Sequence, residues 1–245
     1  MQSEKKEFLS RTELLLGEDG VKRLSEASVI IFGVGGVGGY TLEALVRSGV
    51  EKIALVDADT VSLSNINRQI IATRDTVGRP KVEVARERAL SINPDAKIRT
   101  FPIFYEEKTE NEIDLSEYDY VIDAIDTVTS KLRLIENAKS AGVSIISSMG
   151  AGNKLDPTAF KVADVYKTSV CPLARVIRTE LKRRGIKKLK CVYSEEPAIK
   201  AVAQNDENIP KNRHTPASLA TIPSVVGLII ANEVIKDISE INKQD

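Results

Sequence analysis

The sequence has too few cysteines for a zinc ribbon or a dithiol redox centre. Cys171 and Cys191 are the only two, and they lie 20 positions apart. They form no Cys-x-x-Cys pair, which is the usual source of ligands or of a reactive dithiol in both kinds of site. We therefore expect Cys191, inside an apolar run, to be a core residue. For Cys171, just before Pro172, we expect a packing or helix-capping role rather than a catalytic one.

The sequence also lacks net charge, a long apolar run and an apolar leader. Lysine plus arginine and aspartate plus glutamate both number 35, which disfavours a uniformly basic nucleic-acid-binding protein but allows a local basic patch. The most apolar stretch, Leu219 to Ile235, is interrupted by Pro223, so a buried helix is expected there rather than a membrane span. The first residues do not have the basic-then-apolar order of a secretory signal. We therefore expect a cytoplasmic protein.

Short apolar runs alternate with segments of helical periodicity. Ser28 to Phe32 reads as a strand that stops at glycine, Tyr40 to Arg47 as a helix and Lys52 to Val56 as a second strand. Helices at 81–90 and 130–140 and strands at 97–101, 119–122 and 143–147 continue the alternation. This order predicts an α/β fold with a Rossmann-like doubly wound, mostly parallel sheet.

The alternation loosens after Gly150, so we divide the chain into three parts. Residues 1–27 are expected to form an N-terminal helical arm, 28–150 a nucleotide-binding core and 151–245 a C-terminal extension that shapes the substrate site. Within the extension we expect a turn at 153–157, a helix at 171–184, a strand at 189–193 and a polar mobile loop at 204–216. A final helix at about 223–238 is expected to pack back on the sheet.

Glycines follow the first predicted strand at the spacing of a phosphate-binding loop. Gly33, Gly35 and Gly38 form Gly-x-Gly-x-x-Gly between strand and helix, with Gly36 inside the motif. In this position the backbone can approach phosphates, and the helix N-terminus offers N–H groups to them. Asp57 lies 19 positions after Gly38 at the end of the second strand, where a carboxylate accepts ribose hydroxyl groups. These residues predict a nucleotide site without specifying the nucleotide.

A dense polar run after Asp57 favours ATP over a dinucleotide. Its members are Asp59, Asn65, Asn67, Arg68, Gln69 and Lys81. Transfer of AMP to a carboxylate brings two anions together, so it needs cations and amide donors that are placed in advance. Arg68 suits two-point binding of phosphate, and Lys81 follows Pro80 at a predicted helix start. We therefore predict Arg68 and Lys81 as catalytic cations, and Asp59 and Asn65 with them as nucleotide ligands.

Two aspartates, Asp123 and Asp126, follow the strand at 119–122. Ligand clefts in doubly wound sheets open at the carboxyl ends of strands, so a carboxylate there can reach Mg²⁺ bound to the triphosphate. We predict Asp126 as the Mg²⁺ residue. A role as helix N-cap is the alternative and is compatible with the first.

Together these motifs resemble the ThiF/MoeB/HesA family, relatives of ubiquitin-activating enzymes. The resembling segments are 33–38, 57–59, 64–69, Lys81, 93–94 and 123–126. The segments 145–158, 172–174 and 192–196 are similar to the family's branch of tRNA threonylcarbamoyladenosine dehydratases. The resemblance thus spans nearly the whole chain.

The resemblance implies a ligase that uses ATP and Mg²⁺. Members of the branch adenylate the threonyl carboxylate of threonylcarbamoyladenosine beside the tRNA anticodon, after which intramolecular attack expels AMP and closes a ring. They form homodimers, and in the wider family an N-terminal arginine reaches the nucleotide of the other subunit. Arg11 is the residue that matches, with a plain surface role as the alternative.

A basic segment is the predicted tRNA contact. Between Arg175 and Lys190 there are eight basic residues and one acidic residue, Glu180. Leu173, Ile177 and Leu181 have the spacing of a buried stripe. Arg175, Arg178 and Lys182 share another face of the helix. The predicted contacts are Arg175, Arg178, Lys182 and Arg183. A solvated helix face is the alternative.

Three other functions remain open. An activator of a sulfur-carrier or ubiquitin-like protein would adenylate a protein C-terminus and bring in a sulfur-donor protein as partner; such relatives usually bear four zinc-binding cysteines, which this chain lacks. An NAD-dependent oxidoreductase would leave residues 65–81 without a task. A nucleotide-sensing module would bind ATP without releasing pyrophosphate. His214, in the polar loop, is expected to have no catalytic role.

Overall fold

A computed structural model describes residues 2–200 and 216–240, and its centre is one seven-stranded sheet. The strands are β1 (Ser28–Phe32), β2 (Lys52–Val56), β3 (Lys97–Phe101), β4 (Tyr120–Asp123), β5 (Ser144–Ser148), β6 (Phe160–Asp164) and β7 (Lys190–Ser194). Their order is β3-β2-β1-β4-β5-β7-β6, and every neighbouring pair is parallel except β6 with β7. The predicted doubly wound, mostly parallel fold is confirmed.

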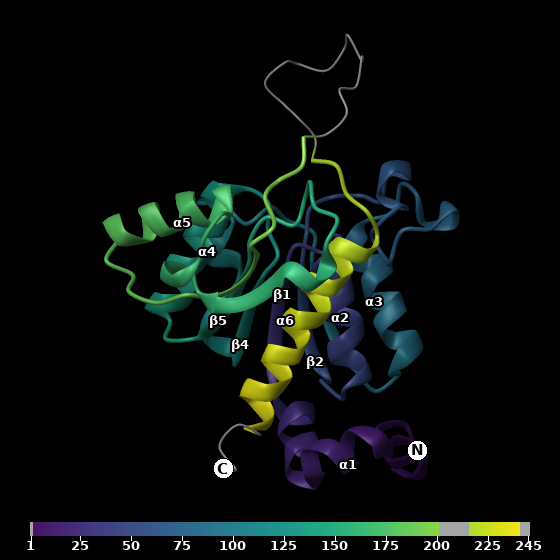
Figure 1. The fold of residues 1–245 in the computed structure, drawn as a ribbon. Coiled ribbons are helices and arrows are strands. Elements are labelled where there is room, and N and C mark those ends of the chain that lie inside the picture. Colours follow the sequence, from purple (N-terminus) through teal and green to yellow (C-terminus); the bar gives the residue numbers. More distant parts are fainter. Residues whose placement is uncertain (1, 201–215, 241–245) are drawn as a thin grey trace.

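Helices cover both faces of the sheet (Figure 1). They are α1 (Gln2–Glu26), α2 (Gly38–Arg47), α3 (Lys81–Ile92), α4 (Val128–Ser140), α5 (Pro172–Arg183) and α6 (Thr221–Ser239). Side chains of α2, α3 and α6 pack with Val29 and Ile31 of β1 in one core, and those of α4 and α5 pack with Ile30 and Phe32 in the other. Alternate residues of β1 therefore serve opposite cores, which explains why the strand is apolar throughout.

The last helix is fixed to the sheet by packing and by a polar network. α6 packs against α2, and the Tyr120 hydroxyl donates to Asp237 Oδ2 at 2.7 Å. The Lys190 ammonium lies 2.7 Å from the same carboxylate oxygen. Because α6 begins beside the glycine loop, its first turn contributes to the nucleotide site.

The first helix lies at the end of α6 that is remote from that site (Figure 1). The Arg23 guanidinium donates to the Ser239 carbonyl oxygen, which ties α1 to the C-terminal end of α6. α1 bends at Gly17, whose φ of 73° and ψ of 167° are not helical. The predicted division of the chain at residues 27 and 150 stays a prediction. The strands β7 and β6, which follow residue 150, belong to the same sheet as the strands before it.

The strand β6 was not predicted from the sequence. β6 is an edge strand in which Lys161 and Val162 are exposed, so its residues do not form the apolar run of a central strand. Short 3₁₀ turns fill the connections, at Leu63–Asn65, Arg74–Thr76, Glu110–Glu112, Leu115–Glu117, Pro157–Ala159 and Val165–Lys167. Within residues 2–200 and 216–240, none of the helices is both long enough and apolar enough to span a bilayer.

Candidate nucleotide site

The direction of the chain across the sheet reverses between β1 and β4. From β1, the strands β2 and β3 are added on one side of the sheet, and β4 and β5 are then added on the other side, with all five strands parallel. Such a reversal opens a crevice at the carboxyl ends of the strands. A cavity of about 550 Å³ lies there, which is within the usual size of a small-molecule site.

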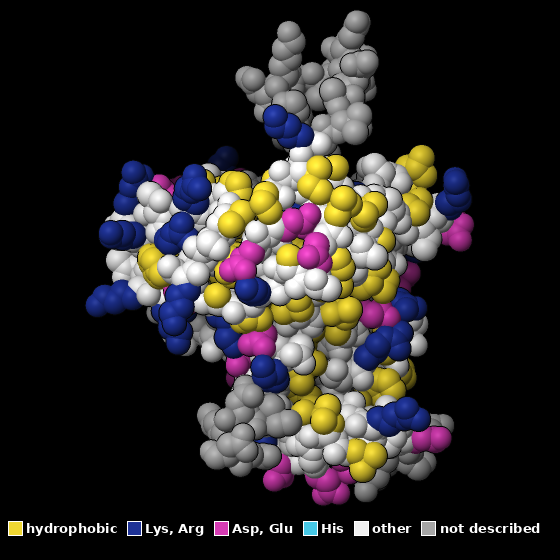
Figure 2. Space-filling view, in the orientation of Figure 1, with side chains coloured by type: hydrophobic (Ala, Val, Ile, Leu, Met, Phe, Trp, Pro, Cys, Tyr) yellow, Lys and Arg dark blue, Asp and Glu magenta, His cyan; other side chains and the backbone are white. Residues whose placement is uncertain are grey.

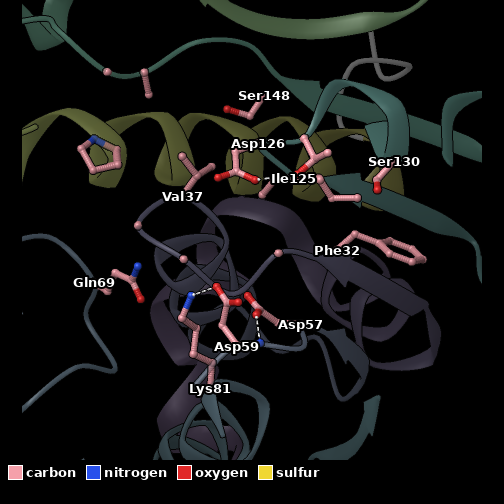
Figure 3. A pocket seen from close by; sticks show the side chains of 18 of the residues that line it. Phe32, Val37, Asp57, Asp59, Gln69, Lys81, Ile125, Asp126, Ser130 and Ser148 are labelled. Atoms are coloured by element: carbon pink, nitrogen blue, oxygen red, sulfur yellow. Dashed lines mark hydrogen bonds and ion pairs between the residues drawn. The ribbon is translucent and has the colours of Figure 1, made fainter. Parts of the chain in front are cut away.

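Most of the predicted site residues line this cavity. They are Gly33, Gly35, Gly36, Asp57, Asp59, Asn65, Arg68, Lys81 and Asp126. Figure 3 shows Asp57, Asp59 and Lys81 on one side of the cavity and Asp126 with Ser148 on the other. Residues at or after the ends of β1, β2, β4 and β5 therefore meet residues of α3, α4, α5 and α6 around one space.

The glycines of the loop are required for different reasons. Gly33 has φ 89°, and a Cβ there would lie 2.6 Å from the Ala124 carbonyl oxygen. A Cβ on Gly38, the first residue of α2, would overlap the Gly33 carbonyl oxygen. At Gly35, within the described part of the chain, a Cβ would meet only Gln69 Nε2, at an ordinary contact distance of 3.7 Å. Packing thus requires Gly33 and Gly38, whereas the protein itself leaves room at Gly35, as close approach of a ligand would need.

Asp57 holds the glycine loop from the end of β2. Its Oδ2 accepts a hydrogen bond of 2.7 Å from the Val34 amide, and its Oδ1 accepts one of 2.9 Å from the Asp59 amide. Burial raises the pKa of Asp57, although the Lys81 charge and the two amides act in the opposite direction. Each carboxylate oxygen can accept a further hydrogen bond, so Asp57 can hold the loop and still receive ribose hydroxyl groups.

Lys81 is nearly buried, with its side chain 7% exposed, and it lies at the first position of α3. Its ammonium group is 2.7 Å from Asp59 Oδ2, and the Asp59 side chain is 54% exposed. The ion pair therefore fixes the cation at the wall of the cavity while its partner faces solvent.

Asn65, Arg68 and Gln69 come from the turn that follows β2. The Asn65 Oδ1 accepts a hydrogen bond of 3.0 Å from the Ser62 amide, which fixes the turn. Arg68 Nη1 donates to Ser64 O and to Asn67 Oδ1, both at 2.9 Å. Among the described residues no group pairs with the remaining guanidinium nitrogens, so these are available to a phosphate.

Gln69 belongs to the polar run that favours ATP, but it was not named as a nucleotide ligand. It is 6% exposed and lines the cavity, and among the described residues its Oε1 has no hydrogen-bond partner. An unpaired buried amide oxygen is costly unless a ligand or water donates to it. The sequence places Gln69 next to Arg68, but burial, which only the fold gives, is the signal that marks it.

The two aspartates after β4 have opposite environments. Asp123 is fully buried and its Oδ2 lies 2.7 Å from the fully buried Lys131 ammonium. That lysine also donates to Ser148 O at 3.0 Å. Asp123 is therefore a structural residue, and the network holds the ends of β4 and β5 together below the cavity.

Asp126 instead has an exposed carboxylate that faces the cavity. Its hydrogen-bond partner is the Thr127 hydroxyl, at 3.3 Å. The alternative N-cap role is wrong, because Thr127 occupies the N-cap position of α4 and no side chain caps it. No cluster of three or more metal-ligating side chains occurs in the described part of the chain. A metal ion held here would consequently take most of its ligands from phosphate and water, as Mg²⁺ usually does.

A further wall of the cavity is formed by residues that were not predicted individually as site residues. It consists of the loop Gly150 to Gly152 after β5, Leu173 at the start of α5 and the segment with Pro216 and Ser218. Leu173 was expected in the buried stripe of α5. The structure assigns that stripe to Ala174, Ile177 and Leu181.

The predicted tRNA contacts lie away from the cavity, on and beside α5. Figure 2 shows Lys and Arg side chains gathered over this helix. Arg175 and Lys182 are exposed, whereas Arg178 is turned inward and donates to the Thr168 carbonyl oxygen at 2.9 Å. Arg183 pairs with Glu180 at 2.8 Å. The surface is basic, but its cations are not equally available to a ligand.

The other residues singled out in the sequence lie outside the site or outside the described chain. Arg11 is exposed on α1 and does not line the cavity. Cys191 is buried in β7, where burial raises the pKa of its thiol to about 12. Cys171 is buried at the N-cap position of α5 and makes no side-chain capping bond. His214 and most of the predicted loop at 204–216 lie outside the described residues.

Comparison with known proteins gives a consistent result. The ThiF family model matches residues 9–245. The tRNA threonylcarbamoyladenosine dehydratase of Bacillus subtilis is 42% identical over 237 residues, which cover 94% of this chain and 93% of the relative. The sulfur carrier protein adenylyltransferase of Thermus thermophilus is 34% identical over 131 residues, which cover 54% of this chain and 48% of the relative.

Solved structures agree with the sequence comparison. The Escherichia coli tRNA threonylcarbamoyladenosine dehydratase TcdA in complex with AMP superposes with a TM-score of 0.87 at 31% identity, covering 98% of this chain and 97% of that one. The same enzyme in complex with ATP gives a TM-score of 0.85 at 30% identity, with the same coverage. The chain belongs to the ThiF family, in its branch of tRNA threonylcarbamoyladenosine dehydratases.

Proposed function

We propose that this protein is an ATP-dependent ligase that adenylates the threonyl carboxylate of threonylcarbamoyladenosine in tRNA and then closes it to the cyclic nucleoside. The observation that carries the proposal is a single cavity in which a glycine loop open to a ligand faces Lys81, Arg68 and the solvent-exposed carboxylate of Asp126. The names of the nearly full-length relative in B. subtilis and of the TcdA complexes support the same substrate and nucleotide.

The residues around the cavity bind ribose at the end of β2 and the phosphates at the end of β1. Asp57 receives the ribose, and the backbone of the glycine loop at Gly33, Gly35, Gly36 and Gly38 receives the phosphates together with the N-terminus of α2. Asn65, Arg68 and Lys81 complete the phosphate side, while Asp59 holds Lys81 in place. Gln69 adds a buried amide to this set.

Asp126 would hold Mg²⁺ bound to the triphosphate, and the ion would supply positive charge that offsets the growing negative charge of pyrophosphate. The exposed carboxylate fits this role because no cation among the described residues neutralises it. Asp123, which is buried beside Lys131, does not.

The chemistry then has two steps. An oxygen of the substrate carboxylate attacks the α-phosphorus, the bond to the bridging oxygen breaks and pyrophosphate leaves, with Arg68 and Lys81 stabilising the charge. An internal nucleophile of the same nucleoside next attacks the acyl carbon and AMP leaves, which closes the ring. Since the nucleophile belongs to the substrate, no enzyme thiol is needed, in accord with two buried cysteines.

The proposal extends to the partners. Exposed cations on α5, with Arg175 and Lys182 foremost, contact tRNA phosphates, Arg183 lies beside them and Arg178 fixes the helix to Thr168. The protein works in the cytoplasm, where its tRNA is found.

The decisive test is substrate choice. Purified protein with ATP, Mg²⁺ and tRNA bearing threonylcarbamoyladenosine should release pyrophosphate and AMP and form the cyclic nucleoside. Asp126→Asn should lower the rate about 10²- to 10³-fold, whereas the exposed Asp95→Asn should leave it unchanged. Activity on the C-terminal glycine of a small sulfur-carrier protein, with none on the tRNA, would instead establish the alternative and would call for a sulfur-donor partner.

We further propose a homodimer in which Arg11 of one subunit serves the site of the other. Two leucines near it on α1, Leu14 and Leu15, are 89% and 75% exposed, as expected for a surface that a second subunit covers. In its own chain Arg11 does not reach the cavity. The arrangement predicts complementation between two inactive variants.

An equimolar mixture of Arg11→Ala and Asp126→Asn, refolded together, should recover about a quarter of wild-type activity, because half of the dimers then hold one intact site. Each variant alone should be nearly inactive. Equal mixtures that stay inactive would show that Arg11 does not act across the interface, and sedimentation would report whether the dimer exists.

A further inference from the structure

Asn153, on the loop after β5, joins three separate segments of the chain. Its backbone amide donates to Ala217 O at 2.8 Å, and its side-chain Oδ1 accepts from the Ala217 amide at 2.8 Å. Its own carbonyl oxygen accepts from the Ile199 amide at 2.9 Å. The residue has φ 57°, in the left-handed region that asparagine tolerates better than most residues.

These contacts make one wall of the cavity. Gly152, next to Asn153, packs against Pro216 so closely that a Cβ on it would lie 2.5 Å from Pro216 Cβ. Gly152, Pro216 and Ser218 all line the cavity. A segment that enters from a distant part of the sequence is thus held against the β5 loop by a paired set of hydrogen bonds.

The strand order places this wall on the side away from the nucleoside part of ATP. Asp57 follows β2, the glycine loop follows β1, Asp126 follows β4 and Asn153 follows β5, and these strands are consecutive in the sheet. The β5 loop therefore lies two strands, about 10 Å, beyond β1. Ribose on β2 and phosphates on β1 leave the β5 side for the molecule whose carboxylate attacks.

The same wall is tied to the phosphate side by Asn67. Asn67 Nδ2 donates to Ser218 O at 3.1 Å, and its Oδ1 accepts from Arg68 Nη1 at 2.9 Å. Hydrogen bonds on either side of the Ala217–Ser218 backbone thus connect the Arg68 guanidinium with the β5 loop.

We propose that Asn153 is a positioning residue for the acyl substrate: by clamping Ala217 it holds the wall of Gly152, Pro216 and Ser218 that orients the nucleoside carboxylate toward the α-phosphorus. The inference rests on the proposed function and adds the part of the cavity that receives the carboxylate-bearing nucleoside. It assigns no contact with ATP to Asn153.

Asn153→Gly isolates the clamp. Glycine allows the same left-handed backbone and keeps the hydrogen bond from the backbone amide to Ala217 O. The substitution removes only the side-chain acceptor. Asn153→Ala removes the acceptor and adds backbone strain. Leu155→Ala is a matched control, because Leu155 belongs to the same loop, is 60% exposed and does not line the cavity.

Steady-state kinetics should show kcat/KM for the modified tRNA lowered about tenfold in Asn153→Gly, since small errors in orientation are expensive in rate. The dissociation constant of ATP, measured by titration, should stay within twofold of wild type. Asn153→Ala should lose at least as much, and Leu155→Ala should match wild type. A thermal midpoint close to wild type for Asn153→Gly would show that the fold is kept.

Two results would overturn the inference: unchanged kcat/KM in Asn153→Gly, or a loss of ATP affinity equal to the loss in kcat/KM. The wild-type reaction serves as the separate test of the proposed function. If wild-type protein forms no AMP with the modified tRNA, the proposed function fails and this inference fails with it. If the wild type is active and Asn153→Gly equals it, only this inference fails.

Discussion

Gly35→Ala is expected to weaken ATP binding about 10- to 100-fold, corresponding to the usual cost of forcing a methyl group into a filled site, without unfolding the protein. Of the residues that the structure describes, the added Cβ would meet only Gln69, at 3.7 Å from its Nε2, and Gly35 needs no left-handed backbone. The space that the methyl group takes is therefore the space that the phosphates need. Titration with ATP and thermal unfolding of the same sample would measure both quantities.

Gly38→Ala is the matched contrast, since the same atom added three residues away would overlap the Gly33 carbonyl oxygen. We expect it to destabilise the fold by about 3 kcal/mol or more. ATP affinity unchanged by Gly35→Ala would mean that nothing approaches this backbone closely, and the glycine loop would then be a packing motif only.

Lys131→Met should produce the largest loss of stability among the charged residues discussed, about 3–5 kcal/mol. Lys131 and Asp123 are both fully buried, 2.7 Å apart. Removing the cation leaves a carboxylate with no counter-charge in the core, where Ser147 remains as a hydrogen-bond donor. For a chain of this size the thermal midpoint should fall by roughly 10 °C.

Lys139→Met, the same substitution at an exposed position of α4, serves as its control and should change stability by less than about 0.5 kcal/mol. Asp123→Asn combined with Lys131→Met removes both charges and should recover part of the loss. A loss below about 1 kcal/mol for Lys131→Met alone would contradict a strongly coupled buried pair.

The contrast between Asp123 and Asp126 gives the site its division of labour. The first joins β4 to β5 through Lys131, and the carboxylate of the second is exposed at the cavity surface. The two carboxylates take different roles because Asp123 is the last, buried residue of β4, whereas Asp126 lies in the exposed loop that follows the strand.

The sequence by itself determined the sheet core, the glycine loop and the polar residues that follow it. Each of these has a local signature: apolar runs bounded by glycine, Gly-x-Gly-x-x-Gly between strand and helix, and a carboxylate at a strand end. The nine predicted residues that line the cavity were found in this way, because parallel strands bring their carboxyl ends to one edge whatever the details of packing.

Tertiary structure alone decided the rest. Asp123 differs from Asp126 through burial, the Gln69 Oε1 is buried with no partner among the described residues, and Asn153 bonds to Ala217, which lies 64 positions away. β6 was missed since an edge strand is half exposed and lacks a continuous apolar pattern. Burial and contacts between distant segments depend on how the whole chain packs, and no local pattern of residues encodes them.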